Sequence, residues 1–276
     1  MKRILKDVLM DFRLRKRAIM AFNLQNLYHL EAAKSIAEKL KTPLMIQFSE
    51  RYLRFLDEKY GIEFLLSTYS NQFIYFHLDH CIDIEFIKYC INSGFDSVMY
   101  DGSAFDIDSN IKNTNIIMKH ASKVGCLVEG ELGKVSGVED GFGDTGSSYA
   151  EIEEIEKYIK ETNIHLMALG IGNAHGFYNN LNGLKTTILK EASKKLDDNQ
   201  FYVLHGGTGL PENIINETID YGVVKINVST EVKKHTMDIL QLYATKNKLY
   251  NEISFNNLMT EQLSQLFEEY LVKYTK

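Results

Sequence analysis

The feature that most constrains the fold is an alternation, repeated eight times, of a short apolar stretch and a longer amphipathic one. The first pair is AIMAFNL followed by NLYHLEAAKSIAEKLK, and the last is VVKINVS followed by TEVKKHTMDILQLYAT. Nearly continuous apolar strands separated by helices are typical of a parallel sheet whose faces are covered by helices. Eight such units in a chain of 276 residues predict a (β/α)8 barrel.

A doubly wound open sheet is the structural alternative. It would usually carry a glycine-rich dinucleotide turn after the first strand, and AFNLQN contains no glycine. No linker rich in proline, glycine or serine interrupts the pattern, so we expect residues 1–276 to form one barrel domain. The tail NEISFNNLMTEQLSQLFEEYLVKYTK predicts an extra C-terminal helix at about residues 260–276, packed on the barrel or on a partner subunit.

Composition excludes several classes of protein. The formal net charge of -6 argues against a nucleic-acid partner, since phosphate backbones require a basic surface. No apolar stretch approaches the roughly 18 residues of a membrane span, and no signal-peptide core is recognisable. The 3 cysteines lack metal-type CxxC spacing and fit a reducing compartment. We therefore expect a cytoplasmic protein.

Polar residues gather at the C-terminal ends of the expected strands, which is where a (β/α)8 barrel carries its active site. In chain order these residues are Asn23, Ser49, Asp79, His80, Asp101, Glu131, His175, His205, Asn227, Ser229 and Thr230. Because every expected strand contributes to this set, the sequence predicts a single site at one end of the barrel.

Three histidines of this set, His80, His175 and His205, come from different strands. Converging imidazoles suit a divalent metal such as Zn²⁺, which in catalytic sites keeps one position open for substrate. The alternative is that each is an ordinary hydrogen-bonded residue at the barrel rim. His77 lies one pleat further inside, and we expect it to support the site rather than to bind metal.

Two further segments suggest a phosphate site and a mobile loop. Gly176, Gly206 and Gly207 adjoin the histidines, and NVSTE offers hydroxyls and backbone amides at a helix start, which suits an anion. Tight turns would explain the glycines equally. ELGKVSGVEDGFGDTGSS predicts a loop that could carry the carboxylate of Glu139 into the site, or a solvated acidic loop.

The motifs AFNLQN, QFSE, HLDH, SVMYDGS, VEGELGKVSGVEDG, GNAHG, LHGGTGLP and KINVSTE, in this order, resemble the class II, metal-dependent ketose-bisphosphate aldolases. This family includes fructose-bisphosphate and tagatose-bisphosphate aldolases. The resemblance covers roughly residues 18 to 245. It departs from the family at Asn179, where many relatives carry a lysine.

The resemblance implies roles for individual residues. It implies that His80, His175 and His205 bind the catalytic zinc, with Asp101 and Glu131 at secondary acidic positions around the metal, and possible use of a second divalent or monovalent cation. It further implies that Asp79 transfers the proton at the substrate C4 hydroxyl and that Glu139 is the acid/base of the mobile loop. The positions that match those holding dihydroxyacetone phosphate are Gly176, Gly206, Gly207, Thr208, Asn227, Val228, Ser229 and Thr230, and we expect Asn23 and Ser49 to contact substrate as well.

The chemistry agrees with these roles. Cleaving a carbon–carbon bond beta to a ketone leaves negative charge that a zinc ion stabilises as a Lewis acid, so no Schiff-base lysine is needed. The expected function is reversible cleavage of fructose or tagatose 1,6-bisphosphate by a dimer or tetramer. The alternatives are an aldolase for another ketose phosphate, a zinc hydrolase on the same barrel, and a sugar-phosphate-binding barrel without catalysis.

Overall fold

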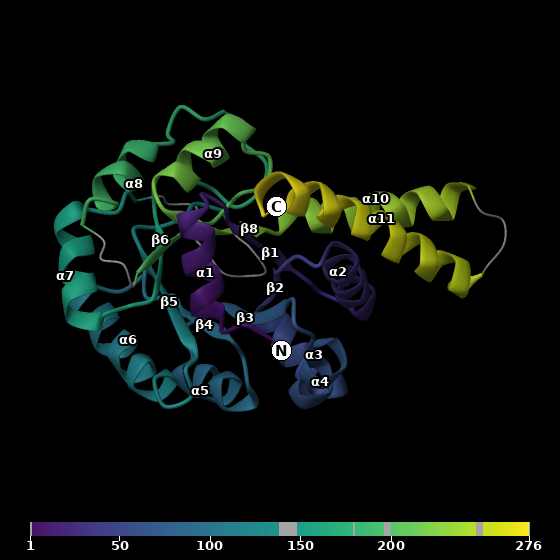
Figure 1. The fold of residues 1–276 in the computed structure, drawn as a ribbon, viewed down its shortest axis with the longest axis horizontal. Helices are drawn as coiled ribbons and strands as arrows, with labels where there is room; N and C mark the ends of the chain where they lie inside the picture. The colour runs from purple at the N-terminus through teal and green to yellow at the C-terminus, as the bar shows by residue number, and fades with distance from the viewer. Residues whose placement is uncertain (1, 138–147, 179, 196–199, 247–250, 276) are drawn as a thin grey trace.

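The computed structural model describes residues 2–137, 148–178, 180–195, 200–246 and 251–275. Its core is a closed barrel of parallel strands in the order β1 to β8, in which β8 pairs with β1 (Figure 1). The strands are β1 (Ile19–Asn23), β2 (Leu44–Ser49), β3 (Ile74–Cys81), β4 (Ser97–Tyr100), β5 (Leu127–Leu132), β6 (Leu166–Leu169), β7 (Phe201–Leu204) and β8 (Val223–Val228). The predicted (β/α)8 barrel is confirmed.

Helices pack against the barrel, and most of them join one strand to the next. They are α1 (Leu5–Leu14), α2 (Leu27–Leu40), α3 (Glu50–Tyr60), α4 (Ile62–Tyr69), α5 (Ile84–Ser93), α6 (Ile107–Ala121), α7 (Ile152–Thr162), α8 (Thr186–Ala192), α9 (Glu212–Asp220), α10 (Thr230–Lys246) and α11 (Glu252–Tyr274). Short polar residues start several of them. The side chain of Asp83, for example, accepts hydrogen bonds from the backbone N–H groups of Glu85 and Phe86 at the start of α5.

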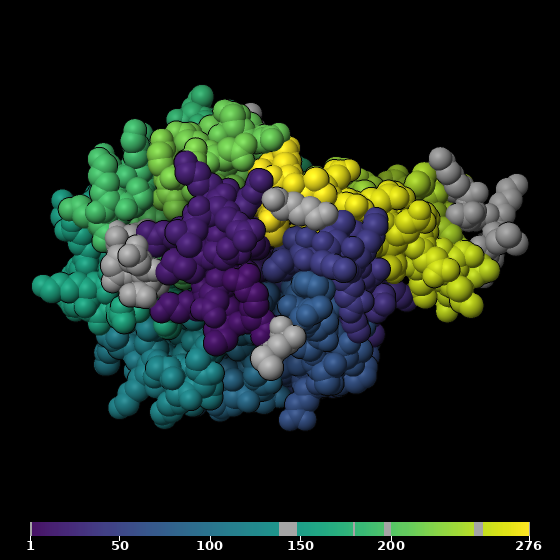
Figure 2. Space-filling view, in the orientation of Figure 1, coloured from purple at the N-terminus to yellow at the C-terminus, as the bar shows by residue number. Residues whose placement is uncertain are grey.

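The barrel interior changes from apolar at one end to polar at the other. At the N-terminal end of the strands, inward-facing side chains such as Met45, Leu127 and Phe201 pack against α1. This helix lies across that end of the barrel and covers it (Figures 1 and 2). Leu9 of α1 is fully buried in the same cluster. The opposite end, where the loops leave the strands, is therefore the end left for a site.

Three helical features differ from the sequence-based expectation. The helix α1 was not anticipated, because its segment was considered only as a possible signal sequence. The segment after β2 forms two helices rather than one, since Gly61 adopts a left-handed φ of 81° that ends α3. The C-terminal helix begins at Glu252 rather than near residue 260, because the side chain of Asn251 caps it by accepting from the N–H of Ser254.

The last two helices form an arm that projects from one side of the barrel (Figure 1). Within the arm, the His235 imidazole of α10 lies 3.3 Å from the backbone oxygen of Gln262 in α11. The barrel end of α11 returns to β1, where the rings of Phe22 and Phe267 lie 4.4 Å apart between centroids. The backbone N–H of Ala18 also donates to the oxygen of Tyr274 at 3.0 Å.

A buried histidine joins α2 to α10. The His29 Nδ1 accepts from the N–H of Gln25 at 3.2 Å, and Nε2 lies 2.9 Å from the hydroxyl of Thr236. That hydroxyl donates to the oxygen of Val232, so the neutral ring with a proton on Nε2 satisfies every group. Burial lowers the pKa of His29 to about 4.

We expect acid to weaken the fold through His29. The folded-state pKa of about 4 lies below the value near 6.5 of an unfolded chain. The contribution of the neutral His29 ring to the free energy of unfolding is therefore complete above pH 6.5 and is lost as pH falls toward 4. The full effect is about 3 kcal/mol, from about 1.4 kcal/mol for each pKa unit. Urea unfolding at pH 7.5 and pH 5 should show a smaller pH effect on the free energy of unfolding for His29→Gln than for the unaltered chain. Equal pH effects in the two proteins would contradict the prediction.

Candidate active site

Polar side chains from several strands meet inside the C-terminal end of the barrel. The amide of Asn23 on β1 donates to the carboxylate of Asp79 on β3 at 2.8 Å, and the amide of Asn227 on β8 donates to the same carboxylate at 3.2 Å. The rings of His80, His175 and His205 lie beside one another at this end. The structure thus brings Asp79 together with Asn227, which lies 148 positions later in the chain.

A β-bulge lets two consecutive residues of β3 face the site. In a regular strand, neighbours point to opposite faces, so Asp79 and His80 would diverge. The pairing of β3 with β4 shifts between Leu78 and Cys81, and His80 adopts a left-handed φ of 43°. The extra residue turns the His80 side chain to the same side as Asp79. This backbone irregularity is a precondition for the site.

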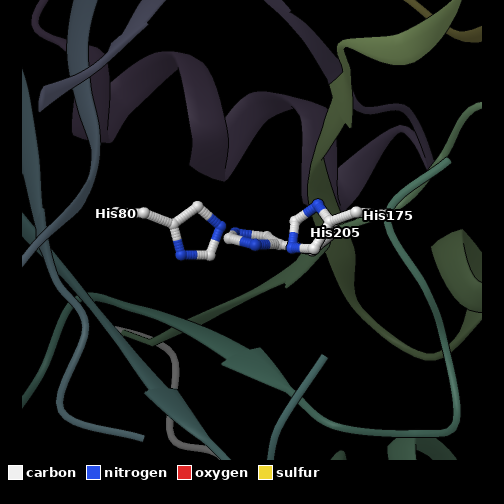
Figure 3. A group of neighbouring side chains, drawn as sticks. All are labelled: His80, His175 and His205. Atoms are coloured by element: carbon white, nitrogen blue, oxygen red, sulfur yellow. The ribbon is translucent and has the colours of Figure 1, made fainter. Parts of the chain in front are cut away.

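The three histidine rings converge on a common point (Figure 3). The ring centroid of His80 lies 5.2 Å from that of His175 and 4.7 Å from that of His205, and the other pair is 6.2 Å apart. Each ring offers a nitrogen, and the three nitrogens lie within 4.8 Å of one another. Three nitrogens at this spacing can hold a metal ion with a position left for substrate.

Hydrogen bonds on the far sides of two rings leave their inner nitrogens without a partner. Nδ1 of His80 lies 2.8 Å from a carboxylate oxygen of Asp101, and Nε2 of His205 lies 2.9 Å from one of Glu129. Nε2 of His80 and Nδ1 of His205 are buried and have no hydrogen-bond partner among the described residues. Because an unpaired buried nitrogen is costly, these two atoms fit a metal ion.

Two carboxylates complete the surroundings of His80. Asp101 binds both His80 and the hydroxyl of Ser103, so it orients the imidazole. The Glu131 Oε2 has no partner among the described residues and lies 3.7 Å from Nδ1 of His205. Burial and the charge of Asp101 raise the pKa of Glu131 well above its usual range. A bound cation would favour the ionised form of this carboxylate, which makes His80, Asp101 and Glu131 a second possible ligand group.

The carboxylate of Asp79 is held in place and kept ionised. Burial alone would raise its pKa, but electrostatic interactions with neighbouring groups, first with His80 and also with Lys225, lower the pKa below its usual range. The amides of Asn23 and Asn227 each bind one of its two oxygens. An ionised, oriented carboxylate beside the three histidines can accept a proton from a bound substrate.

The predicted phosphate-binding residues lie after β6 and around the ends of β7 and β8. Gly206 has a φ of 67°, and an added Cβ would lie 2.2 Å from the backbone oxygen of Ala174, so this position requires glycine. At Gly207 an added Cβ would lie 2.6 Å from the side chain of Ile226. At Gly176, φ is 105° and nothing lies within 4 Å of an added Cβ, so that position is open.

Several buried polar atoms in the same region have no hydrogen-bond partner among the described residues. They include the hydroxyls of Ser49 and Ser229 and the Asn227 Oδ1. The hydroxyl of Thr208 accepts from the N–H of Glu231 in α10 at 3.5 Å. Val228 is the last residue of β8, and Thr230 is the first of α10. The predicted acid/base Glu139 and the departure at Asn179 lie outside the described residues.

Sequence reasoning missed polar residues that face the barrel interior below the site. Gln47 donates to the Asn23 Oδ1, while Glu129 and Lys225 form a fully buried ion pair at 2.7 Å. His77 was expected to have a supporting role, and its imidazole lies 3.1 Å from Nζ of Lys225. The signal was present in β5, because Glu129 lies two residues before Glu131 and so shares its face.

Comparisons with known proteins identify the family and agree with the fold. Residues 4–275 match the family model for class II fructose-bisphosphate aldolase. A fructose-bisphosphate aldolase of Ureaplasma parvum is 37% identical over 235 residues, which are 83% of this chain and 79% of that protein. A 6-phospho-5-dehydro-2-deoxy-D-gluconate aldolase of Bacillus subtilis is 34% identical over 232 residues, covering 82% and 79%.

Solved structures show the same relationship. A putative fructose-1,6-bisphosphate aldolase from Coccidioides immitis superposes with a TM-score of 0.86 at 26% identity, over 97% of this chain and 94% of that one. In the part of the chain that the structure describes, no helix is long and apolar enough to cross a membrane. The chain belongs to the class II fructose-bisphosphate aldolase family and is an aldolase, a carbon–carbon lyase.

Proposed function

We propose that this aldolase uses a zinc ion to cleave fructose or tagatose 1,6-bisphosphate reversibly to dihydroxyacetone phosphate and glyceraldehyde 3-phosphate. The observation that carries the proposal is the pair of unpartnered imidazole nitrogens, on His80 and His205, beside the ionised carboxylate of Asp79. A metal site next to a positioned base is what cleavage beta to a ketone requires.

The residues that would hold the zinc are His80, His175 and His205, with Asp101 and Glu131 around them. When bound, the ion supplies Lewis-acid stabilisation for the negative charge that develops on the ketose as the bond breaks. Asp101 holds the ring of His80 so that Nε2 faces the site. The same cluster of carboxylates would accommodate a second cation.

Asp79 would take the proton from the C4 hydroxyl during cleavage and return it during condensation. Its carboxylate is suited to this because the amides of Asn23 and Asn227 restrict its rotation while leaving lone pairs on both oxygens. We assign the proton on the carbon next to the carbonyl to Glu139, from the loop after β5. Such positioned proton transfer typically contributes about 10²- to 10⁴-fold to a rate.

The phosphate of dihydroxyacetone phosphate would lie between the loops after β6, β7 and β8. Support comes from Gly206, where no side chain fits, and from the unpartnered hydroxyl of Ser229, which stands just before α10. Backbone N–H groups at the start of that helix favour an anion. The full set proposed for the substrate is Asn23, Ser49, Gly176, Gly206, Gly207, Thr208, Asn227, Val228, Ser229 and Thr230.

A second candidate substrate is 6-phospho-5-dehydro-2-deoxy-D-gluconate. It is favoured by the Bacillus subtilis relative, whose identity of 34% is close to the 37% of the fructose-bisphosphate aldolase. This compound carries one phosphate and a carboxylate instead of two phosphates. Both substrates use the same bond cleavage, so the metal and Asp79 would act alike on each.

A cleavage assay on a panel of purified ketose mono- and bisphosphates tests these assignments. The panel includes both bisphosphates and the phospho-deoxygluconate compound, each with zinc and with a chelator. We expect zinc-dependent cleavage of a bisphosphate. Preferential cleavage of the phospho-deoxygluconate compound would support the second candidate, whereas no cleavage of any member by zinc-loaded protein would refute both.

A further inference from the structure

A chain of hydrogen bonds runs through the barrel interior from β4 to the metal-binding histidines. The hydroxyl of Ser97 lies 2.8 Å from the His77 Nδ1, whose Nε2 lies 3.1 Å from Nζ of Lys225. Lys225 donates to the Glu129 Oε2 at 2.7 Å, and the Glu129 Oε1 lies 2.9 Å from Nε2 of His205. Each of these side chains is 0% exposed. None of these side chains reaches solvent, so each must find its hydrogen-bond partners among the others.

The direction of each hydrogen bond follows from Lys225, because an ammonium group donates and cannot accept. Nε2 of His77 must therefore accept, which leaves the proton of this ring on Nδ1, where it is donated to Ser97. Lys225 also donates to Glu129. Its other partner, the neutral ring of His77, cannot balance the positive charge of the ammonium group. Glu129 is the counter-charge in this fully buried pair, so it is ionised and only accepts.

The ionised state of Glu129 also determines which ring nitrogen of His205 carries the proton. Because both oxygens of Glu129 accept, Nε2 of His205 must carry the ring proton and donate it. Nδ1 of the same ring then holds a lone pair, and this is the atom without a partner among the described residues. This nitrogen lies 3.7 Å from Oε2 of Glu131, and the centroid of its ring lies 4.7 Å from that of His80.

We propose that Lys225 and Glu129 are positioning residues that hold His205 in the tautomer with Nε2 protonated, so that Nδ1 is ready for the metal. The inference rests on the proposed metal site but not on any substrate. The side chain of Lys225 binds His77 and Glu129, and its role is to keep Glu129 an acceptor. A merely structural ion pair would leave the tautomer of His205 undefined.

Nitrogen NMR of the metal-free full-length chain tests the proposal directly. With imidazole nitrogens labelled, long-range nitrogen–proton correlations distinguish the two neutral tautomers. We expect a protonated Nε2 in His205 and the opposite tautomer, with a protonated Nδ1, in His77. A protonated Nδ1 in His205 at neutral pH, or an equal mixture of the two tautomers, would overturn the proposal.

Two variants make a sharper test through zinc affinity, measured by competition with a chelator. In Glu129→Gln the amide oxygen must turn to Lys225, so the NH2 group faces Nε2 of His205 and forces the proton onto Nδ1. We expect zinc affinity to fall about 10- to 100-fold, the usual effect of losing such a partner. In the double variant E129Q/K225M the amide is free to present its oxygen to His205.

The double variant should therefore bind zinc more tightly than Glu129→Gln alone. It also restores charge balance in the barrel interior, so it remains testable if the single variant does not fold. Tyr202→Phe on β7 is the matched control, because it removes one buried oxygen from the strand that leads to His205, an oxygen with no hydrogen-bond partner among the described residues. We expect its zinc affinity to match that of the unaltered chain.

Each outcome has one meaning. Weaker binding by E129Q/K225M than by Glu129→Gln, or an equal loss in Tyr202→Phe, would overturn the proposal in favour of general damage to the barrel. Unchanged affinity in Glu129→Gln would overturn it as well. Zinc binding and substrate cleavage are measured separately, so a chain that binds zinc but cleaves no ketose phosphate refutes the proposed function and leaves the tautomer result standing.

Discussion

Replacing Asp79 with alanine is expected to reduce the turnover number by about 10²- to 10⁴-fold, the contribution of a positioned proton-transfer group, while zinc stays bound. The carboxylate is held by amides of β1 and β8, not by the histidine nitrogens that face the metal site. Its loss therefore removes the base and spares the ligands. Turnover is measured on zinc-loaded protein with the cleaved ketose phosphate, and metal content is measured on the same sample.

Glu85→Ala provides the control for this variant. Glu85 lies on α5, where its carboxylate pairs with Lys88 at the surface, so its removal should change neither turnover nor metal content. Unchanged turnover in zinc-replete Asp79→Ala would remove this residue from the mechanism. Loss of zinc from Asp79→Ala would mean that the carboxylate belongs to the metal site instead.

For His175→Ala we expect loss of zinc together with loss of turnover. One of three converging nitrogens disappears, and the remaining pair, His80 and His205, cannot enclose the ion. The loss of affinity should exceed the roughly 10- to 100-fold that follows from removing an outer hydrogen-bond partner. Equilibrium dialysis against zinc, followed by elemental analysis, measures it.

The matched control is His120→Ala, a histidine of α6 that bonds to Asn92 away from the barrel interior. It should retain both zinc and turnover. A full equivalent of zinc in His175→Ala would exclude this histidine as a ligand and would leave the group of His80, Asp101 and Glu131 as the alternative.

The positions of the strand ends could be predicted from the sequence because each short apolar run is followed by polar residues. A parallel barrel brings all strand ends to one rim, so Asn23, Asp79, Glu131 and Asn227 could be placed together before any coordinates were known. The pairing of Asp79 with His80 could not be derived in this way. Strand periodicity sends these neighbours to opposite faces, and only the bulge in β3 reverses that.

The interior polar residues were missed for a different physical reason. A lysine or glutamate inside a strand that is otherwise apolar has no local signature of its partner, which lies on another strand. Lys225 and Glu129 are 96 residues apart in the chain and 2.7 Å apart in the barrel. Only the closure of the sheet shows that one neutralises the other. The helix ends at Gly61 and Asn251 were also missed, although each depends on a local feature, a positive φ at Gly61 and a side-chain cap at Asn251.

Because α11 packs on β1, part of the fold can form only late in the synthesis of the chain. The backbone N–H of Ala18 donates to the oxygen of Tyr274, and the hydroxyl of Thr275 donates to the oxygen of Ala18. The outer surface of β1 is therefore covered in part by residues that lie more than 250 positions later in the chain. During translation at about 5–20 residues per second, this strand stays exposed for more than about ten seconds. Covering of this surface is therefore a late event, and in a nascent chain of this protein the outer face of β1 stays open to chaperones until α11 has left the ribosome.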